Sequence, residues 1–193
     1  GSSSAGTYTV TYAVIVTGCG MATATSIVTI TALPVATFSY AGTPYCSNEG
    51  DPLPTFSGGG VAGIFSSTPG LIFANASTGR IDLSASTPGT YTVTNTIAAA
   101  GGCVVVTATT TITISALPIA DFTYSDSPYC SNESDPLPTF STGGAAGVFS
   151  STPGLVFISS LTGRVDLSAS SPGIYTVVNT IPAGGGCGMV AAS

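Results

Sequence analysis

The chain has 193 residues, of which 44% are hydrophobic and only 5% charged, and its formal net charge is −6. It contains no Lys, His or Trp, and its two cations are Arg80 and Arg164. This composition argues against nucleic acid as a partner, which needs clustered Lys and Arg, and against an anionic membrane surface. Because the commonest general base and the amine nucleophile are missing, we expect no enzyme activity. No apolar run reaches the roughly 20 residues of a membrane-spanning helix, so we expect no membrane insertion.

The composition predicts an all-β protein. Gly and Pro together supply 38 of the 193 residues, and the apolar residues are interrupted by Thr and Ser. No segment has a convincing 3.6-residue apolar period, whereas many short runs of Val, Ile, Phe, Tyr and Thr end at turn residues. We therefore predict many short strands joined by turns.

The first part of the chain, residues 1–34, is predicted to be the C-terminal part of a preceding repeat. Residues 5–19, "AGTYTVTYAVIVTGC", are similar to residues 88–103 with one residue fewer. Residues 25–34, "TSIVTITALP", are similar to residues 109–118, "TTTITISALP". Two segments in the same order thus occur at the N-terminus and again later in the chain.

Residues 35–118 are predicted to form a complete Ig-like repeat. Gly, Pro, Asn or Ser occurs at every junction between its apolar runs, as expected between short strands. Seven strands in a unit of about 84 residues are typical of an Ig-like β-sandwich. The predicted strands are 36–40, 53–56, 63–67, 71–75, 80–86, 90–98 and 104–115.

A second copy follows without a gap. Residues 36–103 match residues 120–187 at a constant offset of 84, with 48 of 68 positions identical. Residues 119–193 are therefore predicted to be an Ig-like repeat that lacks its last strand. We expect the whole sequence to be a segment of a longer tandem array. The short Pro-containing link at 32–38, which recurs at 116–122, predicts a semi-rigid, elongated rod.

The five cysteines follow the same period. Cys19, Cys103 and Cys187 form one series at an offset of 84, and Cys46 and Cys130 form another. The simplest pairing is one bond per repeat, Cys46 with Cys103 and Cys130 with Cys187, with Cys19 paired outside these residues. Each bond would contribute roughly 4 kcal/mol and implies an oxidising, extracellular location. A cysteine metal site is the alternative, but there is no CxxC pair.

Several stretches resemble a known family. They are "PYC" at 44–46, "FSSTPGL" at 65–71, "STGRIDLSASTPGTYTV" at 77–93 and "GGC" at 101–103. These stretches resemble the Ig-like repeats of very large cell-surface proteins from Bacteroidota, including gliding-motility adhesins and related proteins secreted by the type IX system. The resemblance covers essentially the whole chain. It implies a secreted, surface-anchored array that serves as a stalk, filament or adhesin.

Two acids in each repeat are candidate calcium ligands. They are Glu49 and Asp51 in the first copy and Glu133 and Asp135 in the second. Carboxylates and neighbouring carbonyls suit Ca²⁺, but the DxDxDG pattern is missing. We expect no other metal and no cofactor. The alternative is a solvated loop whose acid caps backbone amides as "DPLP" starts a turn.

A second pair of residues in each copy is predicted to be structural. Arg80 and Asp82 lie two apart on a predicted strand and so share a face. Arg80 is expected to form an ion pair with neighbours of Asp82 or with the acidic loop at 49–51. Arg164 and Asp166 are the equivalent residues of the second copy.

These observations predict a structural segment of an extracellular filament or adhesin that holds a distal tip away from the cell. Its partners would be neighbouring repeats, other copies in a filament, and a glycan or surface at the tip. One alternative is a weak glycan- or surface-binding module in every repeat, acting by avidity. Another is lateral self-assembly of several chains into an extracellular fibre or sheath.

Overall fold

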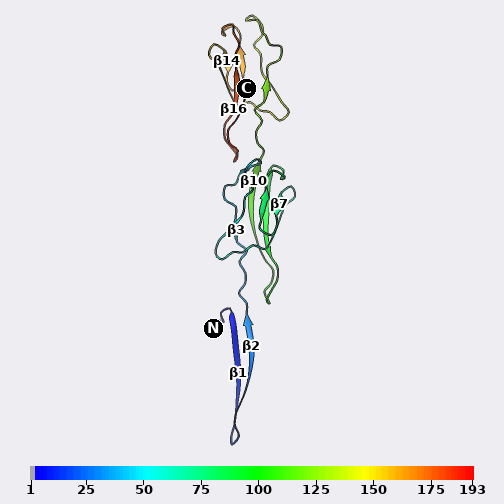
Figure 1. Cartoon of the computed structure of the whole chain (residues 1–193), viewed down its shortest axis with the longest axis vertical. Coiled ribbons are helices and arrows are strands. Elements are labelled where there is room, and N and C mark those ends of the chain that lie inside the picture. Colours follow the sequence, from blue (N-terminus) through cyan, green and yellow to red (C-terminus); the bar gives the residue numbers. More distant parts are fainter. Residues whose placement is uncertain (1–2) are drawn as a thin grey trace.

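The structure is a computed structural model that describes residues 3–193. Every regular element in this range is a β-strand, so the protein is all-β. None of these residues forms a helix long and apolar enough to cross a membrane. Figure 1 shows three parts in succession along the longest axis: an N-terminal hairpin, residues 35–118, and residues 119–193. The sheets of the latter two parts are consistent with a β-sandwich.

The N-terminal part is a single β-hairpin. Its strands β1 (Gly6–Val16) and β2 (Gly20–Ile30) pair antiparallel over their whole length. Nearly all of its side chains are exposed on both faces. A two-stranded hairpin with no sheet or helix packed against it is at best marginally stable in water. Its exposed large apolar side chains are Tyr8, Val10, Tyr12, Ile15, Val16, Met21, Ile27 and Val28.

Residues 35–118 contain all seven strands expected from the sequence and one that was missed. A four-stranded sheet has the order β4-β10-β9-β6, and two further pairs are β3–β5 and β7–β8. The missed strand is β4, which pairs in parallel with the end of β10, Ile114–Ser115. The strands are β3 (Phe38–Ser39), β4 (Tyr45–Cys46), β5 (Thr55–Phe56), β6 (Ile64–Ser67), β7 (Ile72–Asn75), β8 (Arg80–Asp82), β9 (Gly89–Ile97) and β10 (Val106–Ser115).

A compact apolar core lies within residues 35–118. Alternate residues of β9 face it, so that Tyr91 and Val93 are buried while Thr90 and Thr92 are exposed. Buried and exposed residues thus alternate over the first part of this strand, as expected where one face of a strand packs on a core. The buried cluster consists of Phe38, Tyr40, Tyr45, Phe65, Leu71, Ile81, Leu83, Tyr91, Val93, Ile112 and Ile114.

One polar residue, Asn95, interrupts the buried face of β9 and is fully buried. Its Oδ1 accepts a hydrogen bond from the amide of Gly63 at 2.8 Å. Its Nδ2 donates to the carbonyls of Ala36 and Val61, both at 2.9 Å. Because a buried amide needs partners for its donors and acceptor, these three bonds explain how Asn fits an apolar face. Asn179 is fully buried with the same arrangement in the second copy.

Residues 119–193 fold in a similar way but form a smaller sheet. The order β13-β16-β17 makes a three-stranded sheet, and the remaining pairs are β11–β12 and β14–β15. The second copy of "YC", Tyr129–Cys130, forms no strand. The strands are β11 (Phe122–Thr123), β12 (Thr139–Phe140), β13 (Val148–Ser151), β14 (Val156–Ser159), β15 (Arg164–Asp166), β16 (Val177–Ile181) and β17 (Val190–Ala192).

Candidate functional site: the junction cysteines

The structure contains one disulfide among residues 3–193, and it joins the two copies to each other. Cys46 of the first copy is bonded to Cys187 of the second, with their Cα atoms 4.6 Å apart and a sequence separation of 141. The expected bonds Cys46–Cys103 and Cys130–Cys187 are therefore wrong. Within the same range, Cys103, Cys130 and Cys19 are free.

The geometry of β10 explains the error. Cys46 lies opposite Ser115 at the end of this strand. Cys103 precedes Val106, where the same strand begins. A ten-residue strand spans about 33 Å, whereas bridged cysteines have Cα atoms within about 7 Å. The two cysteines of one copy therefore lie at opposite ends and cannot be joined.

A tight glycine turn brings Cys187 to the junction. The amide of Cys187 donates to the carbonyl of Gly184 at 2.9 Å, and the amide of Gly184 donates back at 3.0 Å. Between them, Gly185 and Gly186 have φ angles of +59° and +84°, as the central residues of a type I′ turn require. A Cβ on Gly186 would overlap the carbonyl oxygen of Pro44, so glycine is required for this approach.

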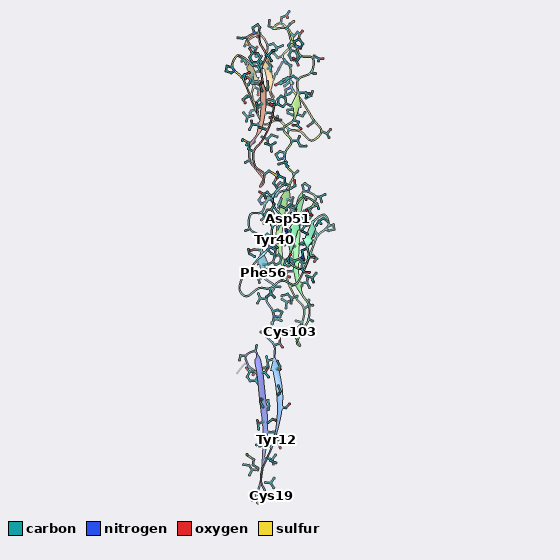
Figure 2. The ribbon with its side chains drawn as sticks, in the orientation of Figure 1. Tyr12, Cys19, Tyr40, Asp51, Phe56 and Cys103 are labelled. Atoms are coloured by element: carbon teal, nitrogen blue, oxygen red, sulfur yellow. A yellow bond between two sulfur atoms is a disulfide. The ribbon has the colours of Figure 1, made fainter. Side chains whose placement is uncertain are left out.

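Cys103 has the same surroundings at the other end of residues 35–118. Its Sγ lies 3.6 Å from the carbonyl oxygen of Ala32. The Sγ of Cys187 lies 3.4 Å from the carbonyl oxygen of Ala116, which is the equivalent of Ala32 in the next repeat. Figure 2 shows Cys103 at the end of the middle part that lies beside the N-terminal hairpin. Cys103 thus occupies the position of Cys187, without a bonded partner among residues 3–193.

The two remaining cysteines are exposed. Cys130 is the counterpart of Cys46, yet Cys46 is fully buried and Cys130 is exposed. Cys19 lies in the turn between β1 and β2, at the far tip of the hairpin. The described chain therefore has one disulfide, which joins the two copies. The equivalents of its two cysteines elsewhere in the chain are free thiols that are exposed or partly exposed.

The acids next to Cys46 hold backbone groups. Asp51 and Asp135 each accept a hydrogen bond from an amide of a later turn, that of Leu83 at 3.2 Å and that of Leu167 at 3.0 Å. These bonds tie the "DPLP" loop to the turn that follows β8 or β15. Both aspartates therefore act as side-chain caps for a second loop.

Glu49 also bonds to backbone, because its Oε2 accepts from the amide of Cys46 at 3.2 Å. No three residues of the types His, Cys, Asp and Glu come together within residues 3–193. Calcium binding by these acids stays a prediction. The candidates are Glu49, Asp51, Glu133 and Asp135.

The two arginines differ in their contacts. Arg80 pairs with Asp51 at 3.4 Å, so it contacts the acidic loop. Arg164 has no ion pair within residues 3–193. The amide of Ala85 and the hydroxyl of Ser84 donate to Asp82 and hold the pKa of its carboxyl below its usual value.

Asp166 of the second copy has the same kind of partners as Asp82. The hydroxyl of Ser168 and the amide of Ala169 donate to it and lower the pKa of its carboxyl. Both aspartates therefore organise the turn that follows their strand.

Comparison with known proteins finds no matching family model, no similar curated protein and no similar solved structure. The functional argument therefore depends on the geometry of the chain. The sequence correctly singled out the cysteines, but the repeat period could not tell whether Cys46 pairs with Cys103 or with Cys187. The register of β4 on β10 decides it.

Proposed function

We propose that the protein is a structural, non-enzymatic segment of a secreted cell-surface filament or adhesin. It would belong to the Ig-like tandem repeats of large Bacteroidota surface proteins, arranged as a semi-rigid rod that holds a distal tip away from the cell. The observation that carries the proposal is the Cys46–Cys187 bond, because it joins successive copies rather than the two ends of one copy.

The junction has two covalent connections. One is the polypeptide itself through the short link that contains Pro118. The other is the disulfide, next to which the glycine turn before Cys187 lies against the carbonyl of Pro44. Two connections at different places restrict bending far more than a single flexible link does. A bond that limits bending at this junction suits a part that transmits position or force along a fibre.

Composition and chemistry also support an extracellular location. Disulfides persist mainly in oxidising compartments outside the cytosol. The only bonds that trypsin-like proteases could cut follow Arg80 and Arg164, which favours survival of an exposed fibre. With only two cations in the whole chain, there is no basic surface for nucleic acid or anionic lipid.

Small-angle X-ray scattering of dilute protein, with and without a reductant, tests the proposal. We expect an elongated profile for the oxidised protein and a broader distribution of interatomic distances after reduction, because the junction then bends about its link. The Cys187→Ser variant should behave like the reduced protein without added reductant. A compact profile for the oxidised protein, or a profile that reduction leaves unchanged, would contradict the proposed stalk.

A further inference from the structure

The disulfide between the two copies shortens the covalent path through the protein. Cys46 and Cys187 are 141 residues apart in the sequence, yet their Cα atoms are only 4.6 Å apart. Residues 47–186, which include most of both copies, therefore form a closed loop. A pull applied before Cys46 and after Cys187 can pass through the two sulfur atoms without entering this loop.

The segment that leads to Cys46, residues 32–46, runs from one end of the first copy to the other. At its start, the carbonyl oxygen of Ala32 lies 3.6 Å from the Sγ of Cys103, close to the first residue of β10. At its end, Cys46 lies opposite Ser115, the last residue of β10. The ten residues of β10 span about 33 Å, whereas residues 32–46 can reach at most about 50 Å. The segment is thus already about two-thirds extended, and tension can lengthen it only a little.

Side chains anchor this segment in the core of the first copy. Phe38, Tyr40 and Tyr45 are each 6% exposed and belong to the buried cluster. The hydroxyl of Tyr40 donates to the carbonyl of Gly79, in the turn between β7 and β8. Because each aromatic side chain buries a large apolar area, pulling the segment off the sandwich would expose that area to water. The segment therefore stays on the first copy when it is pulled along its length.

Hydrogen bonds hold the end of the segment beside β10. The amide of Ser47 donates to the carbonyl of Ser115 at 2.9 Å. The amide of Thr113 donates to the Oγ1 of Thr43, also at 2.9 Å. β4 and β10 are parallel, and these bonds run between them rather than along them. A pull along the strands must therefore break the bonds together and not one after another.

The sulfur atoms themselves are sheltered, because Cys46 and Cys187 are both buried. Next to them, the glycine turn before Cys187 lies against the carbonyl of Pro44. A thiol can break a disulfide only if it reaches one of the two sulfurs. The bond is therefore protected from small thiols while the junction is closed.

Both arginines of the chain lie inside the closed loop. The sequence has no Lys, so Arg80 and Arg164 are the only sites for a trypsin-like protease, and both are exposed. After cleavage at either site, the residues before Cys46 and those after Cys187 are still joined through the disulfide. The bond thus keeps the two ends connected when the backbone between them is cut.

We propose that the Cys46–Cys187 bond carries the tension across the junction. Tension enters along residues 32–46, crosses the two sulfur atoms and leaves through the residues after Cys187. Residues 47–186 then stay folded and carry no tension. This role presupposes the proposed stalk and adds to it the path that a pulling force takes.

Single-molecule pulling from the two ends of the oxidised 193-residue protein measures this path. At full extension, Cys187→Ser should be about 500 Å longer than the wild type, because the 141 residues that the bond spans are then stretched as well. Full extension does not depend on how stably the variant folds. Cys19→Ser is the matched control and should extend like the wild type.

Two results of the pulling experiment would overturn the proposal. Equal lengths of the wild type and Cys187→Ser would show that no bond of Cys187 carries tension. A difference of only about 200 Å would show that Cys187 is bonded to Cys130, within the second copy.

Cleavage by trypsin tests the path independently. We expect a tether of oxidised protein to survive cleavage and to be lost when a reductant is added, whereas a tether of Cys187→Ser should be lost on cleavage alone. Non-reducing electrophoresis in a denaturant confirms that cleavage has occurred. Fragments 1–80 and 165–193 should then migrate together and fragment 81–164 separately. Loss of the oxidised tether on cleavage, or three fragments that stay linked, would overturn the proposal.

The outcome for the stalk can be told apart from the outcome for the tension path. A compact scattering profile of the oxidised protein contradicts the stalk, and with it this role of the bond. An elongated profile together with loss of the cleaved tether leaves the stalk in place and removes only the path through Cys46 and Cys187.

Discussion

Residues 35–118 and 119–193 have 48 identical residues among 68 aligned positions, yet they differ in how fully their cores are covered. Strand β9 has nine residues and its counterpart β16 has five. Tyr45 is 6% exposed, whereas Tyr129 is only partly buried. The hydrogen bonds of Asn95 and Asn179 are nevertheless the same in both, although each of them joins residues 32 or more apart in the sequence. The comparison shows that the buried asparagine keeps its backbone partners in both copies, whereas Ile112 and Ile114 of β10 complete the core of the first copy.

The largest effect is expected from the bond between the two copies. Cys46→Ser should lower the free energy of unfolding by about 5 kcal/mol, the chain-entropy value for a loop of this length. Denaturant unfolding without a reductant measures the difference. Cys19→Ser is the control and should change nothing, because Cys19 is exposed and unbonded. Equal stability of the Cys46→Ser variant and the wild type would show that the bond contributes nothing to the junction.

The second effect concerns the fully buried asparagine of each copy, Asn95 or Asn179. Asn95→Ala and Asn179→Ala should each cost about 3 kcal/mol, because each removes three hydrogen bonds to backbone groups that are buried or partly buried. Both residues are fully buried, so we expect the two losses to agree despite the unequal coverage of the cores. Denaturant unfolding followed by tyrosine fluorescence measures both.

The control for the two asparagine variants is Asn48→Ala. Asn48 is exposed and makes no hydrogen bond through its side chain within the described residues, so its loss should have little effect. A much smaller loss for Asn179→Ala than for Asn95→Ala would mean that an uncovered core admits water to this site.

The smallest effect separates the two arginines. Arg80→Ala should lower stability by at most about 1 kcal/mol, because the Arg80 side chain is 52% exposed and its ion pair with Asp51 is partly screened. Arg164→Ala should cost less, since the described chain gives Arg164 no ion pair. Thermal unfolding at low and high salt measures the difference, which should shrink as salt rises. A larger loss of stability for Arg164→Ala than for Arg80→Ala would contradict the stabilising role given to the Arg80–Asp51 ion pair.

The strands of residues 35–118 could be predicted because short apolar runs end at Gly, Pro, Asn or Ser. The predicted ends of these strands were less accurate than the predicted positions. The run 80–86 was expected to be one strand, but β8 ends at Asp82. The reason is that Asp82 accepts hydrogen bonds from Ser84 and Ala85, which turn the chain out of the sheet. The two-residue strand β4 was missed because it has no alternation of its own and depends on β10 for its pairing.

The candidate site was only half predictable. The acids of the "DPLP" loop were recognised, and the capping role that was weighed for them agrees with the bonds of Asp51 and Asp135. Arg80 was expected to form an ion pair either with neighbours of Asp82 or with the acidic loop at 49–51, and the structure shows the second, through Asp51. The cysteine pairing was wrong, because pairing depends on distance in space and two cysteines of one copy lie at opposite ends of a long strand.

The sequence by itself determined that the chain is all-β, because composition and turn residues leave little else to form. It also determined which residues recur at the repeat period. Only the tertiary structure decided how the copies are joined. The repeat period alone does not decide whether Cys46 pairs with Cys103 or with Cys187. The ten residues of β10 separate Cys46 from Cys103, so this pair cannot form. Cys46 lies instead beside the glycine turn that carries Cys187.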